Sequence, residues 1–359
     1  MKSNYKKLGE YIRQVDIKNK DLKVSRLLGV SISKAFIESI ANTVGTDFSN
    51  YKVVRKGQFA YGPVTSRNGE KISVALLEED ECIISSSYIV FEIVDVEKLL
   101  PEYLMLWFSR PEFDRLARYK SHGSVREIFD WNELCDIHLP VLTVEEQKSI
   151  VMAYKAVKDR IKLKRRINEN LEAQAEAIYN EMIKNNATSY IISSLESTSS
   201  IKTGKLNSEA AVSNGKYPFF TCSQETYRTN TFSFDQEAVL LAGNNASAIY
   251  PLKLFQGKFD AYQRTYVINS TNKLVSNKQL YFILKQQLNE FKGISSGTAT
   301  KFLTMKILNP IPVIIAPKKV AEAFIEATDK IFNVIYQNQD EIKRLTELQG
   351  ALLAAILNH

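Results

Sequence analysis

Residues 143–184 read TVEEQKSIVMAYKAVKDRIKLKRRINENLEAQAEAIYNEMIK, and this stretch decides the fold. Every third or fourth residue in it falls on one ladder, whose rungs are Ile150, Tyr154, Val157, Ile161, Lys164, Asn168, Leu171, Ala175, Ile178 and Met182. Mainly apolar rungs with an average spacing of 3.5 residues are typical of a coiled-coil seam. The stretch therefore predicts a long helix that packs along another helix.

A second ladder supplies that other helix. Its rungs are Phe324, Thr328, Ile331, Ile335, Asn338, Ile342, Leu345, Gln349, Leu352 and Ile356. Each rung lies 174 residues after its counterpart (324 − 150 = 174), and six of the ten positions are apolar in both ladders. The correspondence runs without a gap from Gly123 to Ile183 and from Gly297 to Leu357. The chain is therefore expected to contain the same unit twice.

The repeat divides the chain into four segments, namely a first globular domain (1–142), a central long helix (143–184), a second globular domain (185–316) and a C-terminal long helix (317–359). Thr143 and Glu146 fit a capping box at the first helix start, and Pro317 suits the first position of the second helix. Strand-like and helical stretches are mixed in both domains, so the expected fold class is α+β. Both ladders turn polar midway, and antiparallel pairing would bring Lys164 close to Asn338. These rungs either fix the register of the pair or are exposed at a local bend.

Charge and cysteines narrow the class of protein. The net charge is +7, and residues 185–316 hold 13 basic against 7 acidic side chains. A basic domain favours a polyanionic partner such as double-stranded DNA. The N-terminus lacks an apolar leader, and no run approaches the roughly 20 apolar residues of a membrane span. The three cysteines are far apart, so we expect reduced thiols in a cytoplasmic protein.

Signatures of catalysis are missing from the sequence. The histidines, His122, His138 and His359, have no metal-ligand spacing, and there is no phosphate-binding loop of the GxxxxGK[ST] type. The chain contains no Pro-Pro pair, which excludes the usual Asn/Asp-Pro-Pro-aromatic motif of an amino-methyltransferase. We therefore expect no catalytic residues, no metal site and no cofactor in this chain.

Loops rich in DNA-reading side chains occur in both domains. Arg pairs with guanine, and Asn or Gln with adenine, through two hydrogen bonds, whereas Lys, Ser and Thr more often hold phosphate. Ordinary turn chemistry explains any single residue equally well, so the loops carry weight as a set. The candidates are Thr65, Arg67, Asn68, Ser87, Tyr88, Lys120, Arg126, Gln224, Tyr227, Arg228, Asn244, Asn245, Gln263, Arg264 and Thr298.

Two features of the helices lie outside the seam. The stretch Lys155 to Arg166 has seven basic residues against one acid. It either contacts the DNA backbone or forms a solvated or partner-facing side of the helix pair. Apolar residues also remain that two helices cannot bury between themselves, so partner helices or the ends of the domains must cover them. These are Val151, Leu163, Ile183, Ile325, Val334, Leu348, Leu353 and Leu357.

The sequence resembles the specificity subunits of type I restriction–modification systems. The resemblance rests on residues 51–61, YKVVRKGQFAY, on 123–128, GSVREI, and above all on 134–147, LCDIHLPVLTVEEQ, and it continues in 215–220, Gly243-Asn244 and 297–299. The second helix departs from it, because it begins PKKV without the Glu-Gln of the first copy.

This resemblance implies two target-recognition domains held apart by two antiparallel coiled-coil helices, with a pseudo-twofold internal repeat. Each domain would read half of a split DNA site. Two modification subunits would bind the helices and supply S-adenosylmethionine and the adenine-methylating site, and restriction or translocase subunits could join them.

Three other functions compete with this one. The chain could be the specificity subunit of a type IIB or phage-exclusion methylation system, or a coiled-coil scaffold that links proteins without binding DNA. A self-sufficient methyltransferase-nuclease is disfavoured by the missing motifs.

Overall fold

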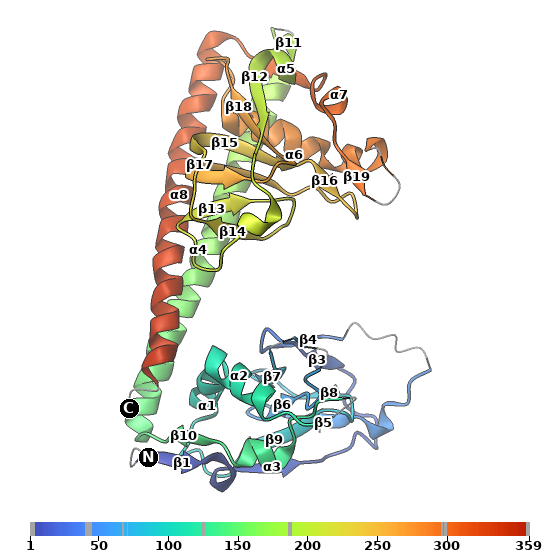
Figure 1. Ribbon diagram of the computed structural model, residues 1–359, viewed down its shortest axis with the longest axis vertical. Coiled ribbons are helices and arrows are strands. Elements are labelled where there is room, and N and C mark those ends of the chain that lie inside the picture. The colour runs from blue at the N-terminus through green and yellow to red at the C-terminus, as the bar shows by residue number, and fades with distance from the viewer. Residues whose placement is uncertain are drawn as a thin grey trace. The chain divides into compact units, whose positions relative to one another are not determined.

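The computed structural model describes residues 4–39, 45–66, 68–69, 71–123, 126–185, 189–295, 297 and 300–356. The chain forms two compact units. The first comprises residues 1–163 and 342–359, and the second comprises residues 164–341. Each unit contains one globular domain and a part of each long helix, so each long helix belongs in part to both units (Figure 1).

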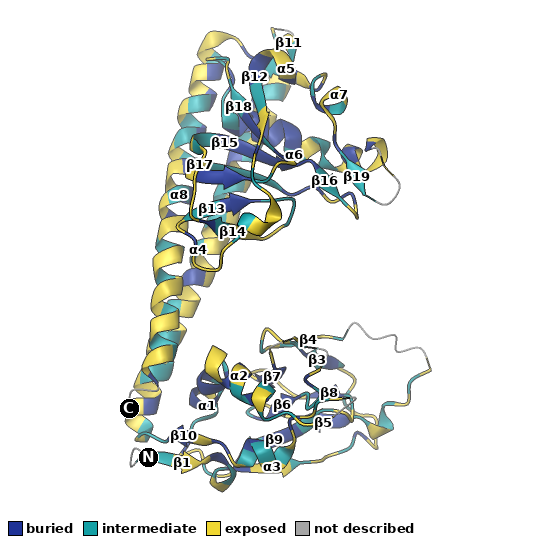
Figure 2. Ribbon diagram, in the orientation of Figure 1, coloured by how far each residue is buried: buried dark blue, intermediate teal, exposed yellow. Residues whose placement is uncertain are grey.

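The long helices are α4 (Val144–Asn185) and α8 (Lys318–Ala355). The capping box at the start of α4 is confirmed, because the Thr143 amide donates to the Glu146 carboxylate at 3.0 Å and the Glu146 amide donates to the Thr143 hydroxyl at 3.4 Å. Helix α8 begins one residue after Pro317, whose carbonyl accepts from the Val320 and Ala321 amides. All twenty rungs of the two ladders are buried or half-buried, while the outer faces are mostly exposed (Figure 2).

The two helices pair antiparallel in each unit. In the second unit, the rings of Tyr179 and Phe324 lie 6.2 Å apart between centroids. In the first unit, the hydroxyl of Tyr154 is hydrogen-bonded to Gln349. The residue numbers of each pair add up to 503 (179 + 324 and 154 + 349). In an antiparallel pair of helices one number rises as the other falls, so a constant sum means that both contacts belong to the same register.

A polar layer interrupts the seam in the second unit. Lys164 Nζ donates to Asn338 Oδ1 at 2.7 Å and pairs with Glu341 at 2.8 Å, and Asn338 Nδ2 donates to Asn168 Oδ1 at 2.8 Å. Asn338 is buried, so the layer is part of the seam and not an exposed bend. A buried polar layer costs stability unless its members meet, and it therefore fixes one register of the helices.

The first domain is built on a four-stranded sheet of order β2-β9-β6-β7, with three further two-stranded pairs, β1–β10, β3–β4 and β5–β8. Three short helices, α1, α2 and α3, lie between β9 and β10 in the chain, and α1 contacts β7. The elements are β1 (Tyr5–Lys7), β2 (Ile12–Val15), β3 (Leu28–Val30), β4 (Phe36–Glu38), β5 (Lys52–Val54), β6 (Phe59–Tyr61), β7 (Val74–Leu76), β8 (Cys82–Ile84), β9 (Ile89–Ile93), α1 (Pro101–Phe108), α2 (Pro111–Tyr119), α3 (Trp131–Cys135) and β10 (His138–Pro140).

The second domain has a six-stranded sheet of order β12-β18-β15-β17-β13-β14 and two pairs, β11–β20 and β16–β19. Its largest helix, α6, packs on strands of this sheet (Figure 1). The elements are β11 (Ile191–Ser194), α5 (Leu195–Thr198), β12 (Ser199–Thr203), β13 (Tyr217–Phe220), β14 (Thr226–Thr229), β15 (Phe234–Ala242), β16 (Asn244–Asn245), β17 (Leu252–Ala261), β18 (Thr265–Ser270), α6 (Asn277–Ile294), β19 (Lys301–Phe302), α7 (Met305–Leu308) and β20 (Pro312–Ile315).

The repeat extends into both domains. The order β2-β9-β6-β7 recurs as β12-β18-β15-β17, and α3 and α7 begin 174 residues apart (305 − 131). One backbone hydrogen bond is also repeated, from the Leu8 amide to the Ile137 carbonyl and from the Leu195 amide to the Ile311 carbonyl (311 − 137 = 174). The expected α+β fold of two similar domains and two long antiparallel helices is therefore confirmed.

Local sequence does not reveal every element of the domains. Strands β5 and β6 are close in the chain but do not pair with each other, because β5 pairs with β8 and β6 pairs with β7 and β9. Residues 101–119 form two helices and not one, since Pro111 cannot continue the hydrogen-bond ladder of α1. Strand β17 has no clear sequence signal, because its residues 252–258 alternate poorly and include Gly257.

The second domain is attached to both long helices by ion pairs. Lys285 of α6 contacts Glu172 and Glu176 of α4 at 2.7 and 2.8 Å, and Lys278 of α6 contacts Asp329 of α8 at 2.7 Å. Burial alone would lower the pKa of Lys285, but the two carboxylates outweigh it and raise that pKa. The lysine therefore stays charged where it joins the domain to the helix.

The first domain is attached differently, through Gln147. This side chain is completely buried, and its Oε1 accepts from the Leu100 amide at 2.8 Å. Its Nε2 donates to the carbonyls of Lys98 and Leu142 at 2.8 and 2.9 Å. The Leu100 amide lies at the N-cap of α1, where no intrahelical acceptor exists. Gln147 therefore ties the start of α4 to the start of α1.

Replacing Gln147 by methionine should destabilise the first unit by at least about 2 kcal/mol, because three backbone groups lose the partner that the buried side chain provides, at about 1–3 kcal/mol each. Urea unfolding followed by circular dichroism measures the loss. Gln174→Met is the matched control on the exposed face of the same helix and should change the unfolding midpoint little. Equal stability of the two variants would contradict the role given to Gln147.

Candidate nucleic-acid interface

Each domain contains two loops that are joined by an equivalent backbone hydrogen bond, and we call them the crossing loops. They lie around Pro63 and Phe129 in the first domain and around Gly243 and Leu303 in the second. In the second domain, the Leu303 amide donates to the Gly243 carbonyl at 2.9 Å, and β16 pairs with β19. In the first domain, the Phe129 amide donates to the Pro63 carbonyl, also at 2.9 Å. Leu303 and Phe129 are counterparts in the repeat (303 − 129 = 174). The candidate loops 61–68 and 243–247 are therefore equivalent parts of the two domains.

A glycine turn shapes the second loop of each pair. Gly123 has φ +130° and Gly297 has φ +111°, which is backbone that favours glycine. A Cβ atom would lie 2.3 Å from the Arg126 carbonyl oxygen at Gly123 and 2.0 Å from the Thr300 carbonyl oxygen at Gly297. The two glycines are 174 residues apart, and so are the two carbonyl oxygens that the added Cβ atoms would meet (297 − 123 and 300 − 126). The same close approach of the backbone is therefore required in both domains.

Candidate residues of the second domain gather around Arg264, between β17 and β18. The Arg264 carbonyl accepts from the Gly243 amide at 2.8 Å and from Cys222 Sγ at 3.3 Å. Its guanidinium lies over the Phe302 ring, 5.3 Å from the centroid, and both Gln263 and Arg264 are exposed. Three loops therefore meet at one exposed arginine. Phe302 did not stand out in the sequence, although it follows the glycine turn closely.

The two asparagines beside this cluster differ in their freedom. Asn245 Oδ1 accepts from the amides of Ser247 and Ile249 at 2.8 and 3.3 Å, which is ordinary turn chemistry. Asn244 Oδ1 is buried and has no hydrogen-bond partner among the residues that the structure describes. Asn244 Oδ1 therefore lacks a partner among these residues but is closed to solvent, whereas Asn245 Oδ1 is used by the turn.

The remaining candidates of the second domain lie near the β13–β14 hairpin. Gln224 and Tyr227 are exposed. The Arg228 guanidinium donates to the carbonyls of Gly215 and Lys216 at 2.9 and 2.7 Å, so it holds the hairpin and has little capacity left for a base. Thr298 lies outside the described residues.

In the first domain, most candidates are occupied by structural contacts. Thr65 is buried, and its hydroxyl donates to Ser121 and to the Glu127 carbonyl, so this side chain is engaged within the domain. Asn68 donates to the Val64 carbonyl at 3.3 Å. Lys120 contacts Glu133 at 2.6 Å, and this hydrogen bond raises the lysine pKa.

Other candidates of this domain keep more of their surface. Ser87 and Arg126 are exposed. Tyr88 is half-buried, and its hydroxyl accepts from the Val30 amide at 3.5 Å. Arg67 lies outside the described residues. The structure thus brings candidates together more clearly in the second domain than in the first.

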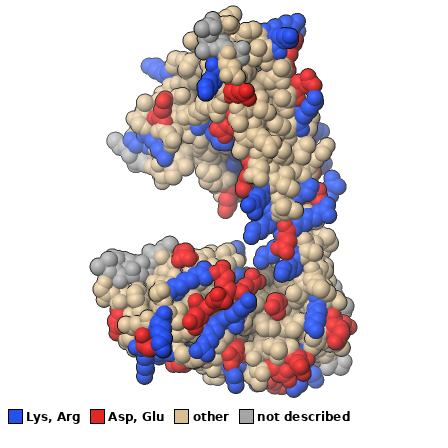
Figure 3. All heavy atoms as spheres, turned by 180° about the vertical axis from the view of Figure 1, so that it is seen from behind, with Lys and Arg blue, Asp and Glu red and all other residues tan. Residues whose placement is uncertain are grey.

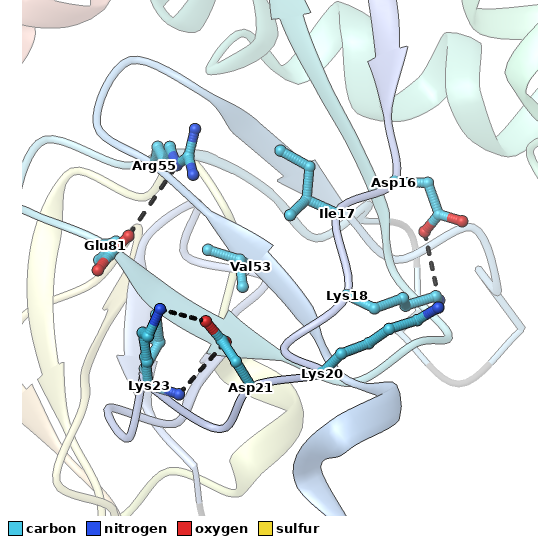
Figure 4. A pocket seen from close by; sticks show the side chains of 10 residues that line it. Asp16, Ile17, Lys18, Lys20, Asp21, Lys23, Val53, Arg55 and Glu81 are labelled. Carbon is cyan, nitrogen blue, oxygen red and sulfur yellow. Dashed lines mark hydrogen bonds and ion pairs between the residues drawn. The ribbon is translucent and has the colours of Figure 1, made fainter.

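A pocket of about 660 Å³ lies in the first domain, and none of these candidates lines it (Figure 4). Most of its basic side chains face acidic ones, since Lys18 pairs with Asp16, Lys23 with Asp21, and Arg55 with Glu81. The hydrogen bond from Lys23 holds the pKa of Asp21 below its usual value. With its charges largely paired, this pocket is a poor site for a polyanion.

No group of three or more metal-binding side chains lies together in the described ranges. Within the same ranges, no helix combines the length and the apolar content needed to cross a bilayer.

Comparison with known proteins finds a family match in the second half of the chain. Residues 193–347 match the type I restriction modification DNA specificity domain. This part of the chain is therefore similar to the DNA specificity domains of type I restriction–modification systems. The match covers the second domain and most of α8, including the crossing loops at Gly243 and Leu303.

Two curated proteins are also similar to this chain. The specificity subunit of the type I restriction enzyme EcoDI of Escherichia coli is 29% identical over 157 residues, which are 44% of this chain and 34% of that protein. The chain thus matches only about a third of the length of that relative. The MjaIX specificity subunit of Methanocaldococcus jannaschii is 22% identical over 303 residues, 74% of this chain and 70% of that protein.

A solved structure shares the fold along the whole chain. The S subunit of a type I restriction–modification system from M. genitalium superposes with a TM-score of 0.59 at 14% identity, covering 98% of this chain and 95% of that one. The first domain, which the family domain does not cover, is thus included in the shared fold.

Arg264→Gln should reduce discrimination between target and unrelated DNA by about 10- to 200-fold, because one good Arg–guanine pair is worth about 1–3 kcal/mol. Fluorescence anisotropy on the two duplexes measures it. Arg115→Gln, at an exposed position of α2, removes the same charge and should leave discrimination unchanged. An Arg264→Gln variant that discriminates as well as Arg115→Gln would exclude Arg264 from base recognition.

Proposed function

We propose that this chain is the DNA-specificity subunit of a type I restriction–modification complex. In this proposal each domain binds one half of a split double-stranded target, and the chain itself catalyses nothing. The observation that carries the proposal is the recurrence of the same crossing loops and glycine turn in both domains. A protein with two equivalent reading surfaces suits a target with two separate halves.

The long helices supply a second part of the proposal, the docking of modification subunits. Four exposed apolar residues, Leu163, Ile167, Val334 and Leu348, each lie one position before a rung. On a coiled coil these positions form one row beside the seam. Alanines at 153, 156, 177, 323, 327, 351 and 355 occupy the same row. An apolar row that the two helices cannot bury fits helices of a protein partner.

The partners would supply the chemistry. We propose that two methyltransferase subunits bind this row and carry S-adenosylmethionine and the site into which the target adenine is flipped. Restriction or translocase subunits could join the same complex, and the complex would work in the cytoplasm. The chain would then contribute only the choice of sequence.

Sequencing of methylated bases tests this function directly. A host that expresses the chain with its methyltransferase subunit should carry N6-methyladenine in one split motif, and deleting the chain should abolish that motif. Methylation that persists without the chain would overturn the proposal, and a complete absence of a split motif would favour a scaffold that does not bind DNA.

The same readout tests the helices as a spacer. Inserting one heptad into both helices, after Lys164 and after Asn338, keeps the seam in phase and adds about 10 Å. The gap in the methylated motif should grow by about three base pairs, at about 3.4 Å each. Inserting the heptad into the 186–188 connection between α4 and the second domain is the control. An unchanged gap after the paired insertion would contradict the spacer role.

A further inference from the structure

The helix pair has a second row beside the seam, formed by residues one position after each rung. In the first unit, Val151 and Leu353 of this row pack against the core of the first domain. In the second unit, Glu172 and Asp329 of the same row contact α6 of the second domain. This domain-facing row is thus distinct from the apolar row that lies one position before the rungs.

Between these attachments the row is strongly basic in the first unit. Its members there are Lys155, Lys158 and Lys162 of α4 and Lys343 of α8, together with Thr346 and Gly350. All are exposed. The acidic residues of the same stretches, Asp159 and Glu347, lie two positions after a rung and therefore one row further out. Figure 3 shows Lys and Arg side chains gathered on the exposed part of the long helices.

The four lysines are unpaired as well as exposed. None of them has an ion pair or hydrogen bond to any residue in the part of the chain that the structure describes. In the second unit the acidic members of the same row are Glu169, Glu172, Glu176 and Asp329, and three of them pair with lysines of the domain. Arg165, near the boundary with the first unit, is the basic member of the row there. The row thus changes from acidic to basic where its contacts with a domain end.

We propose that these lysines bind the phosphate backbone of DNA in the gap between the two half-sites. The inference rests on the proposed function, under which a duplex held by one recognition domain continues to the other along the helices that join them. Lysine is a flexible point charge that neutralises phosphate without reading bases. Sequence-independent contacts of this kind suit a gap whose bases are not specified.

An acidic protein partner is the competing occupant, and the composition of the row argues against it. Stable protein interfaces centre on aromatic and aliphatic anchors and are depleted in lysine. The stretch from Lys155 to Lys162 on this row offers no such anchor, and Thr346 and Gly350 face the same side. The apolar row before the rungs already provides the surface that a protein partner requires.

The test is the salt dependence of DNA binding by the full-length chain. The triple variant Lys155→Gln, Lys158→Gln, Lys162→Gln should lower the slope of log Kd against log salt by about two to three, close to one for each phosphate that is no longer neutralised. The loss should be equal on the split target duplex and on an unrelated duplex of equal length, so discrimination stays unchanged. Lys184→Gln, Lys273→Gln, Lys319→Gln is the control with the same charge change at exposed positions off the row.

Two further arms locate the binding site on the DNA. Replacing the gap phosphates of the duplex by neutral methylphosphonates should weaken DNA binding by the wild-type chain as much as the triple substitution does. The same replacement should not weaken binding by the triple variant any further. Changing the three lysines to arginine should retain the slope, because the positive charges remain. This variant therefore shows whether the effect of the glutamine variant comes from lost charge or from altered folding.

A slope that falls no more in the triple variant than in the control would overturn the proposal. So would an unchanged slope with loss of methyltransferase-subunit binding, because the row would then be a protein-docking surface. The preference of the wild-type chain for the split duplex over an unrelated duplex tests the proposed function alone. The DNA-specificity function and the phosphate contacts of the lysines can therefore be refuted independently of each other.

Discussion

The antiparallel pairing of α4 with α8 is the constraint on which the rest of the structure depends. Each domain ends in a helix too long to be covered by its own core, and the ladder of that helix is buried only if the other copy packs along it in reverse. Lys164, Asn168 and Asn338 form a polar layer that is satisfied in one register alone. The register then decides which rows of the helices face the domains and which remain open.

The two rows beside the seam separate two kinds of surface. The row one position after the rungs holds the domains. It does so through Val151 and Leu353 in the first unit and through ion pairs with Lys278 and Lys285 in the second. Between these attachments the row carries free lysines. Positions before the rungs carry exposed leucine, isoleucine and valine. A single heptad pattern therefore gives the helix pair one side with free lysines and another side with exposed leucine, isoleucine and valine, which suits the proposed contacts with nucleic acid and protein.

Much of this arrangement could be predicted from the sequence because it depends on periodicity. The ladders, the 174-residue repeat and the approach of Lys164 to Asn338 all follow from spacing along regular helices. The domains were harder, since their short strands pair with partners distant in sequence, and β5 joins β8 and not its neighbour β6. Side-chain availability was hardest of all. Thr65 and Arg228 have the residue types of DNA contacts, yet one is buried and the other holds two backbone carbonyls.

The most direct measurement of the central claim is the distance between pairs of spin labels on the two helices of the full-length chain, with the three cysteines replaced. Labels at positions 155 and 350, 158 and 346, and 162 and 343 step along α4 and α8 in opposite directions, and all six positions are exposed. Antiparallel pairing in this register predicts the same short distance for all three pairs. Distances that change by about 20 Å from the first pair to the last, as for helices that run parallel, would contradict the account.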